Sequence, residues 1–141
     1  MRLSIIIPIY NEKYTVEQVI DEVLAAPLPE GIEREVIVVD DASTDGTSHL
    51  LAGIVAGRPQ VTLLRHERNR GKGAAIRTAV QHATGQYIVV QDADLEYDPK
   101  DYARLLAPML AGEADVVYGS RFVPRESRRV LYFWHSVATV S

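Results

Sequence analysis

Runs of β-branched apolar residues alternate along this chain with stretches that have the spacing of amphipathic helices. The apolar runs predict strands at residues 3–8, 35–40, 61–65, 87–91 and 116–119. Between them the pattern predicts four helices, ending near residues 26, 55, 83 and 111, where glycine or proline follows. Because strand–helix–strand units cross over in the right-handed sense, this order predicts an α/β fold. We expect a mostly parallel sheet with helices on both faces, in three layers.

Two helix starts carry recognisable capping patterns. Thr15 and Gln18 have the spacing of a capping box at the start of the first helix. Asp98 precedes Pro99, which predicts an N-cap followed by a first-turn proline at the start of the fourth helix.

Composition limits the class of protein. The 141 residues are the size of one domain, and 47% hydrophobic residues supply a core. A formal net charge of −4 argues against a nucleic-acid partner, and the absence of cysteine excludes disulfides and thiolate metal sites. No run approaches the roughly 18 apolar residues that span a bilayer, so we expect a cytoplasmic chain. The apolar stretch at residues 130–140 stops without a cap, and we expect a fragment of a longer protein.

Polar side chains follow every predicted strand. In a parallel sheet the carboxyl ends lie along one edge, and ligands bind there. This pattern predicts a single ligand site at that edge. The first loop lacks Gly-x-Gly-x-x-Gly, which argues against a dinucleotide dehydrogenase. The loop residues after the predicted strands are Tyr10, Asn11, Glu12, Asp40, Asp41, Gly71, Lys72, Gly73, Asp92, Asp94, Glu96, Ser120 and Arg121.

The acidic segment after the fourth strand is the strongest single signal. In extended backbone, alternate residues face the same way, so Asp92, Asp94 and Glu96 can converge. Carboxylates held that close repel one another unless a cation neutralises them, and Mg²⁺ or Mn²⁺ is the usual hard cation. The segment therefore predicts a metal site for a phosphate ester; the alternative is an acidic surface turn.

The first two loops predict contacts to a nucleoside. Tyr10 can offer a ring face to a base, while Glu12 and Asp41 can only accept hydrogen bonds, from base or ribose donors. Glu12 could instead be favourable charge before a helix. Asp41 could be a turn residue, and for Asp45 we prefer that interpretation.

Basic residues predict phosphate contacts. Lys72 lies between two glycines, and Arg121 begins a basic cluster after the fifth strand. For both, the alternative is a solvated side chain. The histidines His66, His82 and His135 lack ligand-like spacing, so we expect structural or exposed roles.

Four segments together resemble family 2 glycosyltransferases of the GT-A fold: residues 4–12, 38–47, 69–73 and 92–96. Within that family the likeness is closer to dolichyl- or polyprenyl-phosphate sugar transferases, and residues 118–122 fit that subgroup too. The resemblance extends over residues 3–123 and implies a catalytic domain at 1–123. Residues 124–141 would begin an acceptor or membrane-proximal region, with 130–140 starting an interfacial helix.

The resemblance implies roles for matching positions. Asp92, Asp94 and Glu96 would hold Mg²⁺ or Mn²⁺, and Arg121 would contact a donor or acceptor phosphate. Catalysis would depend on Asp92, Asp94 and Arg121. The donor pocket would be formed by Pro8, Tyr10, Glu12, Val39, Asp41, Lys72, Asp92, Ala93, Asp94 and Arg121.

The implied activity is inverting transfer of a hexose from GDP-mannose or a UDP-hexose to polyprenyl or dolichyl phosphate. The full-length protein would then act at the cytoplasmic face of a membrane, and a homo-oligomer is compatible with this activity. Two alternatives stay open. One is transfer to a saccharide hydroxyl, which would need a general base. The other is a nucleotide-sugar-binding module without turnover.

Overall fold

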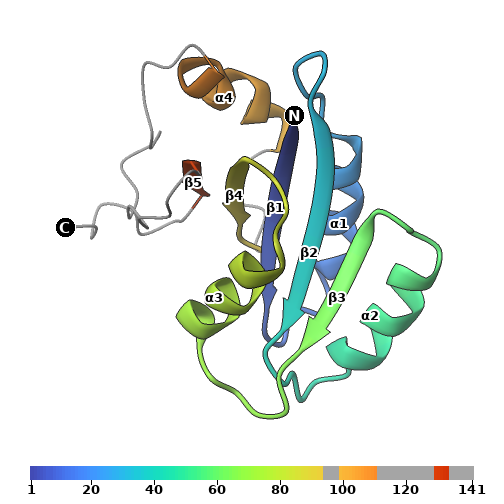
Figure 1. Ribbon diagram of the computed structural model, residues 1–141. Helices are drawn as coiled ribbons and strands as arrows, with labels where there is room; N and C mark the ends of the chain where they lie inside the picture. The colour runs from blue at the N-terminus through green and yellow to red at the C-terminus, as the bar shows by residue number, and fades with distance from the viewer. Residues whose placement is uncertain (94–98, 111–128, 134–141) are drawn as a thin grey trace.

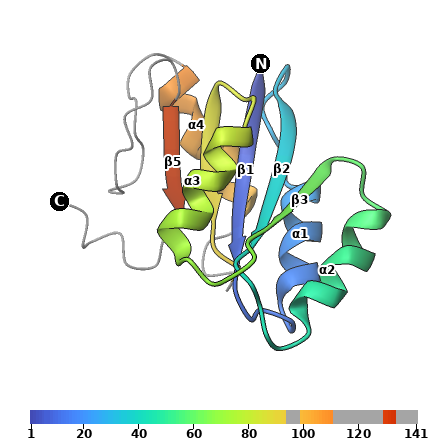
Figure 2. The same ribbon diagram turned by 60° about the horizontal axis from the view of Figure 1, so that its bottom comes forward.

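The computed structural model describes residues 1–93, 99–110 and 129–133, and their strands form one parallel sheet. The strand order is β3-β2-β1-β4-β5, with the earliest strand in the middle (Figures 1 and 2). This confirms the predicted α/β class. The elements are β1 (Arg2–Ile9), α1 (Val16–Ala25), β2 (Glu33–Asp40), α2 (Thr47–Ala56), β3 (Val61–Arg65), α3 (Lys72–His82), β4 (Tyr87–Gln91), a 3-10 turn η1 (Pro99–Asp101), α4 (Tyr102–Leu110) and β5 (Arg129–Phe133).

The core has two parts because successive strand residues face opposite sides of the sheet. Ile5 and Ile7 of β1 pack on the side covered by α1, α2 and α4, whereas Ile6 packs on the side covered by α3. Figure 1 shows α3 in front of the sheet and α1 behind it. Burial on both faces explains why β1 and β2 read as unbroken apolar runs, and it gives the predicted three layers.

The fifth described strand is not at the predicted place. Residues 116–119 lie outside the described part of the chain. β5 comprises residues 129–133 and pairs with β4 from Tyr87↔Arg129 to Gln91↔Phe133. The interfacial helix expected from residue 130 is therefore wrong at residues 130–133. The β-branched and aromatic side chains of this stretch favour extended backbone, and the edge of β4 supplies a pairing partner.

A hydrogen-bonded network closes the amino end of the sheet, opposite the strand ends that carry the polar loops. The Ser4 hydroxyl donates to Glu35 Oε1 at 2.7 Å and accepts the Gly85 N–H at 2.9 Å. Thr84 donates to the same carboxylate through its N–H and its hydroxyl. Burial, the largest single influence, would raise the pKa of Glu35, but these hydrogen bonds and the charge of Arg2 outweigh it and lower that pKa.

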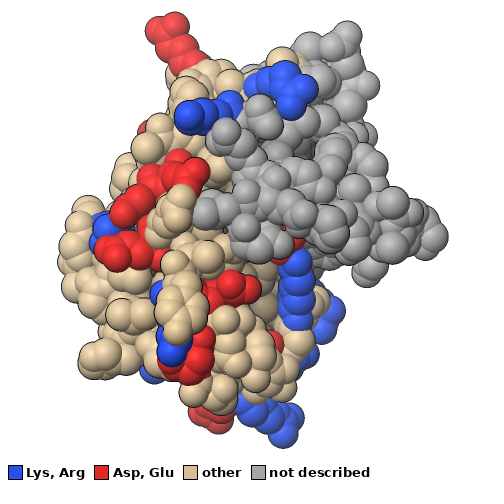
Figure 3. Space-filling model, turned by 180° about the vertical axis from the view of Figure 1, so that it is seen from behind, with Lys and Arg blue, Asp and Glu red and all other residues tan. Residues whose placement is uncertain are grey.

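Charged side chains of both signs are mixed on the face seen from behind (Figure 3). Arg58, which follows α2, links that helix to α1, with Nε 2.8 Å from Asp21 and Nη2 3.4 Å from Glu17. No helix in the described part of the chain has the length and apolar character that a bilayer crossing requires.

Candidate functional site

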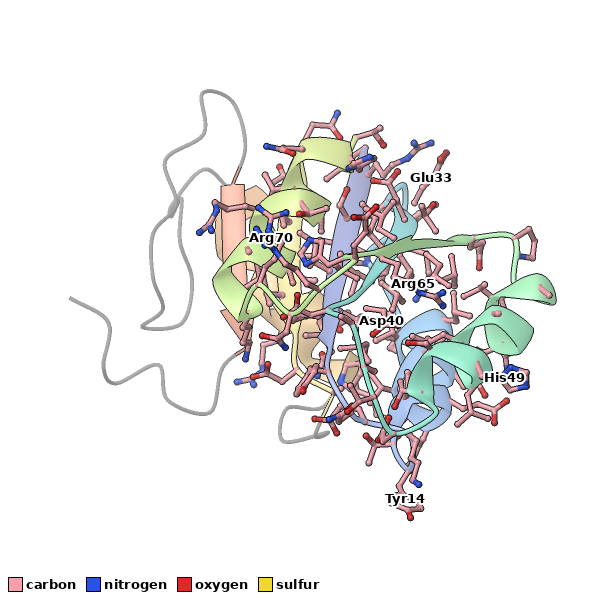
Figure 4. The ribbon with its side chains drawn as sticks, turned by 90° about the horizontal axis from the view of Figure 1, so that it is seen from below. Tyr14, Glu33, Asp40, His49, Arg65 and Arg70 are labelled. Atoms are coloured by element: carbon pink, nitrogen blue, oxygen red, sulfur yellow. The ribbon has the colours of Figure 1, made fainter. Side chains whose placement is uncertain are left out.

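A pocket of about 500 Å³ opens at the carboxyl ends of β1, β2 and β4, beside the first turn of α3. This volume is in the range of small-molecule sites. Figure 4 looks onto this end of the sheet. All of the lining residues were predicted from the sequence as candidate site residues except Ile9, Asn69 and Ala75. The full lining is Pro8, Ile9, Tyr10, Glu12, Asp41, Asn69, Gly71, Lys72, Ala75, Asp92 and Ala93.

Asp41 follows the last residue of β2, and its backbone N–H donates to the Ile9 carbonyl at 2.9 Å. Its Oδ1 lies 2.7 Å from His66 Nδ1 and accepts the Arg70 N–H at 2.9 Å, while Oδ2 accepts the Gly71 N–H at 2.8 Å. Burial is the largest influence on the pKa of Asp41 and would raise it. The hydrogen bonds from His66 and from two backbone N–H groups outweigh burial and lower the pKa. Asp41 is therefore an anion in the pocket wall at neutral pH.

The loop between β3 and α3 wraps around that anion. Gly71 has φ 94°, a left-handed conformation that favours glycine, and this turn aims its N–H at Asp41. Asn69 Nδ2 donates to the Asp41 carbonyl at 3.3 Å. Because the turn ends at Gly71, α3 begins at Lys72.

His66 supports the pocket wall from outside the lining, which is one of the two roles, structural or exposed, that its lack of ligand-like spacing had suggested. It is 7% exposed and lies between Asp41 and Thr78. Strand register could have revealed it. Asp40 and Arg65 are partners in the β2–β3 ladder, so the residues that follow them, Asp41 and His66, come side by side.

The first two polar loops are tied together. Asn11 has φ 53°; its N–H donates to Ser43 Oγ at 2.9 Å and its Oδ1 accepts the Thr44 N–H at 2.7 Å. These bonds fix the backbone beside Tyr10, which is 45% exposed at the pocket. An exposed ring held by an ordered loop is available to stack on a planar ligand.

The predicted capping box at the start of α1 does not form. Thr15 makes no side-chain capping bond; its hydroxyl donates to Glu12 Oε2 at 3.2 Å instead. The Glu12 carbonyl accepts the N–H groups of Thr15 and Val16 at 3.1 and 2.9 Å, which satisfies two donors at the helix start. Gln18 turns forward to Glu22. Glu12 thus both starts the helix and lines the pocket.

Asp92 forms an ion pair with Lys72. Its side chain is largely buried, and the Lys72 ammonium donates to Asp92 Oδ1. Behind it, the Tyr102 hydroxyl donates to Gln91 Oε1 at 2.6 Å, and Gln91 Nε2 donates to the Asp92 carbonyl at 3.3 Å. This support holds the start of the acidic segment at the mouth of β4.

Asp40 and Asp45, the other aspartates near the end of β2, bond to neighbouring residues and do not line the pocket. Asp40 is fully buried; it accepts the Ser43 N–H at 3.0 Å and a hydrogen bond from Ser48, and Arg65 Nε lies 3.5 Å away. Figure 4 shows Asp40 and Arg65 close together at the ends of β2 and β3. Asp45 accepts the N–H of Thr47, the first residue of α2, as expected of a turn residue.

Some predicted site residues are not in the pocket lining. Val39 is fully buried and packs in the core between the sheet and α3. Asp94, Glu96 and Arg121 lie outside the described residues. Their predicted roles stay predictions.

The described part of the predicted metal set suits a hard divalent cation. Among the described residues no group of three or more His, Cys, Asp or Glu side chains gathers as a metal site. Asp92 is the described member of the predicted set, and carboxylate oxygens are the ligands that Mg²⁺ and Mn²⁺ prefer. Its contact with the Lys72 ammonium shows that a positive charge fits at this point of the pocket.

Comparison with known proteins places the chain among sugar transferases. Residues 4–136 match the family described as Glycosyl transferase family 2. A mannosyltransferase from Pyrobaculum calidifontis, solved with GDP-Man and Mn²⁺, is 37% identical with a TM-score of 0.62, over 70% of this chain and 29% of that one.

Two further structures are similar. TarS 1–349 from S. aureus, solved with UDP-GlcNAc, is 27% identical with a TM-score of 0.66, over 89% of this chain and 37% of that one. Glucosyl-3-phosphoglycerate synthase from Mycobacterium tuberculosis was solved with Mn²⁺, UDP and glucosyl-3-phosphoglycerate. It is 30% identical with a TM-score of 0.63, over 85% of this chain and 43% of that one. The chain therefore spans less than half of each of these three structures.

Proposed function

This chain belongs to glycosyl transferase family 2, and from that premise we propose that it carries the donor-binding part of an inverting, metal-dependent hexosyltransferase. The donor is a nucleotide sugar linked to GDP or UDP, and the acceptor is a polyprenyl or dolichyl phosphate. In the full-length protein the reaction takes place at the cytoplasmic face of a membrane.

The observation that carries this proposal is the distribution of polar and charged residues between the two sides of the pocket. Asp41, Glu12 and the exposed ring of Tyr10 lie toward the ends of β1 and β2, and they suit the donor groups and the flat face of a nucleoside. Asp92 and Lys72 provide the charged groups of the β4 side, and they suit a diphosphate with its counterion. Three similar structures were solved with GDP-Man, UDP-GlcNAc or UDP, two of them with Mn²⁺.

Asp92 would hold the divalent ion, together with the sequence-predicted ligands Asp94 and Glu96. When bound, Mg²⁺ or Mn²⁺ supplies positive charge that stabilises a departing nucleoside diphosphate. The residues of this chain do the rest: Asp41 and Glu12 orient the nucleoside, Lys72 neutralises phosphate charge, and Arg121 contacts a phosphate.

A phosphate acceptor agrees with the residues for a chemical reason. A lipid phosphate is already anionic at neutral pH, so its oxygen attacks the anomeric carbon without a strong general base. A saccharide hydroxyl would need a base to take its proton. The basic residues that begin at Arg121 also suit an anionic lipid headgroup.

A transfer assay with the full-length protein tests the proposal. Labelled GDP-mannose and UDP-glucose would be incubated with Mn²⁺ and either polyprenyl phosphate or a saccharide acceptor. We expect label in the lipid fraction, with the anomeric configuration inverted by NMR. Label in the saccharide alone would move the function to hydroxyl transfer. Binding of nucleotide without any transfer or hydrolysis would indicate a nucleotide-sugar-binding module without turnover.

A further inference from the structure

His66 bridges two elements at the back of the pocket. Its Nδ1 lies 2.7 Å from Asp41 Oδ1 and its Nε2 lies 2.8 Å from Thr78 Oγ1, in the second turn of α3. The residue is almost wholly buried, and the backbone N–H of His66 donates to the Asp40 carbonyl at 2.9 Å. Both ring nitrogens and the backbone of His66 are therefore engaged.

The protonation of the ring follows from its partners. Asp41 is held in its ionised form, and an ionised carboxylate can only accept hydrogen bonds. Nδ1 must therefore carry a proton and donate it to Asp41. In the neutral ring Nε2 then accepts the Thr78 hydroxyl proton; a hydroxyl can donate or accept, so Thr78 accommodates the tautomer that Asp41 requires.

Counting acceptor positions shows what Asp41 has left to offer. A carboxylate has about four acceptor positions, two on each oxygen. Within the described residues, Oδ1 takes the His66 ring proton and the Arg70 N–H, and Oδ2 takes the Gly71 N–H. One position on Oδ2 therefore stays available for a ligand, and Asp41 lines the pocket.

We propose that His66 is a positioning residue for nucleoside recognition. It fixes the Asp41 carboxylate so that the remaining acceptor position on Oδ2 meets one N–H or O–H donor of the nucleoside. This inference rests on the proposed function, because it assumes a nucleoside diphosphate donor. His66, which lies outside the pocket lining, would then be one of the residues that determine the affinity for the nucleoside.

The test uses calorimetry with two probes on the 141-residue chain in Mn²⁺ buffer. GDP and UDP report the whole site, whereas inorganic diphosphate reports the phosphate and metal end alone. Three variants separate the roles of the ring. His66→Leu removes both ring contacts, His66→Asn keeps a donor near the position of Nδ1, and Thr78→Val removes only the Nε2 partner.

We expect His66→Leu to weaken binding of the better nucleotide about tenfold, the usual effect of losing a hydrogen bond to a charged group. Inorganic diphosphate should bind as it does to the wild type. His66→Asn should recover most of the loss, and Thr78→Val should cost less than about threefold. A merely structural histidine would instead change the affinity for both probes together.

Three results would overturn the inference. Unchanged nucleotide affinity in His66→Leu, an equal loss for nucleotide and inorganic diphosphate, or an asparagine variant as weak as the leucine variant would each do so. If His66→Leu does not fold, His66→Gln replaces it, because its donor lies one bond farther from the backbone; equal affinities of the Gln and Asn variants would then contradict the proposal. A wild-type chain that binds neither nucleotide would refute the proposed function itself, which distinguishes that failure from failure of the His66 role.

Discussion

Replacing Gly85 by alanine should destabilise the fold by about 2–4 kcal/mol without touching the pocket. A β-carbon at this position would lie 2.7 Å from both the Arg2 carbonyl oxygen and Ser4 Oγ, and 2.9 Å from Ser4 N. Two of these three atoms belong to backbone within β1, the central strand, and cannot turn aside. Relieving such overpacking by backbone shifts costs about 1–3 kcal/mol. The Gly85 N–H bond to Ser4 would lengthen as well, at about 1 kcal/mol.

Gly53 provides the matched control. It lies within α2, and a β-carbon there would have no neighbouring atom within 4 Å. Gly53→Ala should therefore stabilise the protein by about 0.5–1 kcal/mol through helix propensity. Urea unfolding followed by circular dichroism gives both values. A free energy of unfolding for Gly85→Ala within about 0.5 kcal/mol of the wild-type value would refute the steric reasoning. Where Gly85→Ala is folded, it should bind nucleotide as the wild type does.

Three other perturbations have defined outcomes. Arg34→Met should lower the free energy of unfolding in urea by about 1–3 kcal/mol, because both Nη atoms donate at 2.6 Å to carbonyls at the end of α1. Arg2→Met, which removes an exposed ion pair, is the control and should lower it less. The folded-state pKa of Glu35 is lowered, so its stabilising effect is complete above its unfolded pKa of about 4.3 and is lost as pH falls through the folded value. Acid titrations of stability should therefore be steeper below about pH 4 in the wild type than in Glu35→Gln, and parallel curves would contradict this. Lys72→Met should weaken nucleoside diphosphate binding in metal-free buffer at least about tenfold by calorimetry, because the Asp92 charge would face the diphosphate uncompensated, whereas Lys72→Arg should retain most of the affinity.

Sequence patterns located those elements whose limits are set locally. The predicted bounds of β3 and β4 agree with the structure, because turn residues or polar loops flank both runs. β2 begins two residues earlier than predicted because Glu33 and Arg34 pair with Arg2 and Leu3 of β1. Such an extension depends on the neighbouring strand and is invisible in local composition.

The site was predictable to the extent that it follows from strand ends. The rule that parallel strands share a carboxyl edge brought Tyr10, Glu12, Asp41, Lys72 and Asp92 into one pocket. The contribution of His66 depends on register between β2 and β3, which no spacing along the chain reveals. Val39 is the register partner of Pro8, which lines the pocket, so strand alternation alone would place it at the site. Its complete burial in the core under α3 keeps it out of the lining, and local sequence does not reveal that burial.

The carboxyl-end pocket as a metal-dependent nucleoside diphosphate site is the central claim. Calorimetric titration of the wild type and of Asp92→Asn with GDP and UDP, with and without Mn²⁺, tests it most directly. We expect Mn²⁺ to strengthen binding of one nucleotide to the wild type, and we expect Asp92→Asn to lose this dependence while its circular dichroism spectrum stays unchanged. Equal Mn²⁺-dependent affinity in the wild type and in Asp92→Asn would contradict this claim.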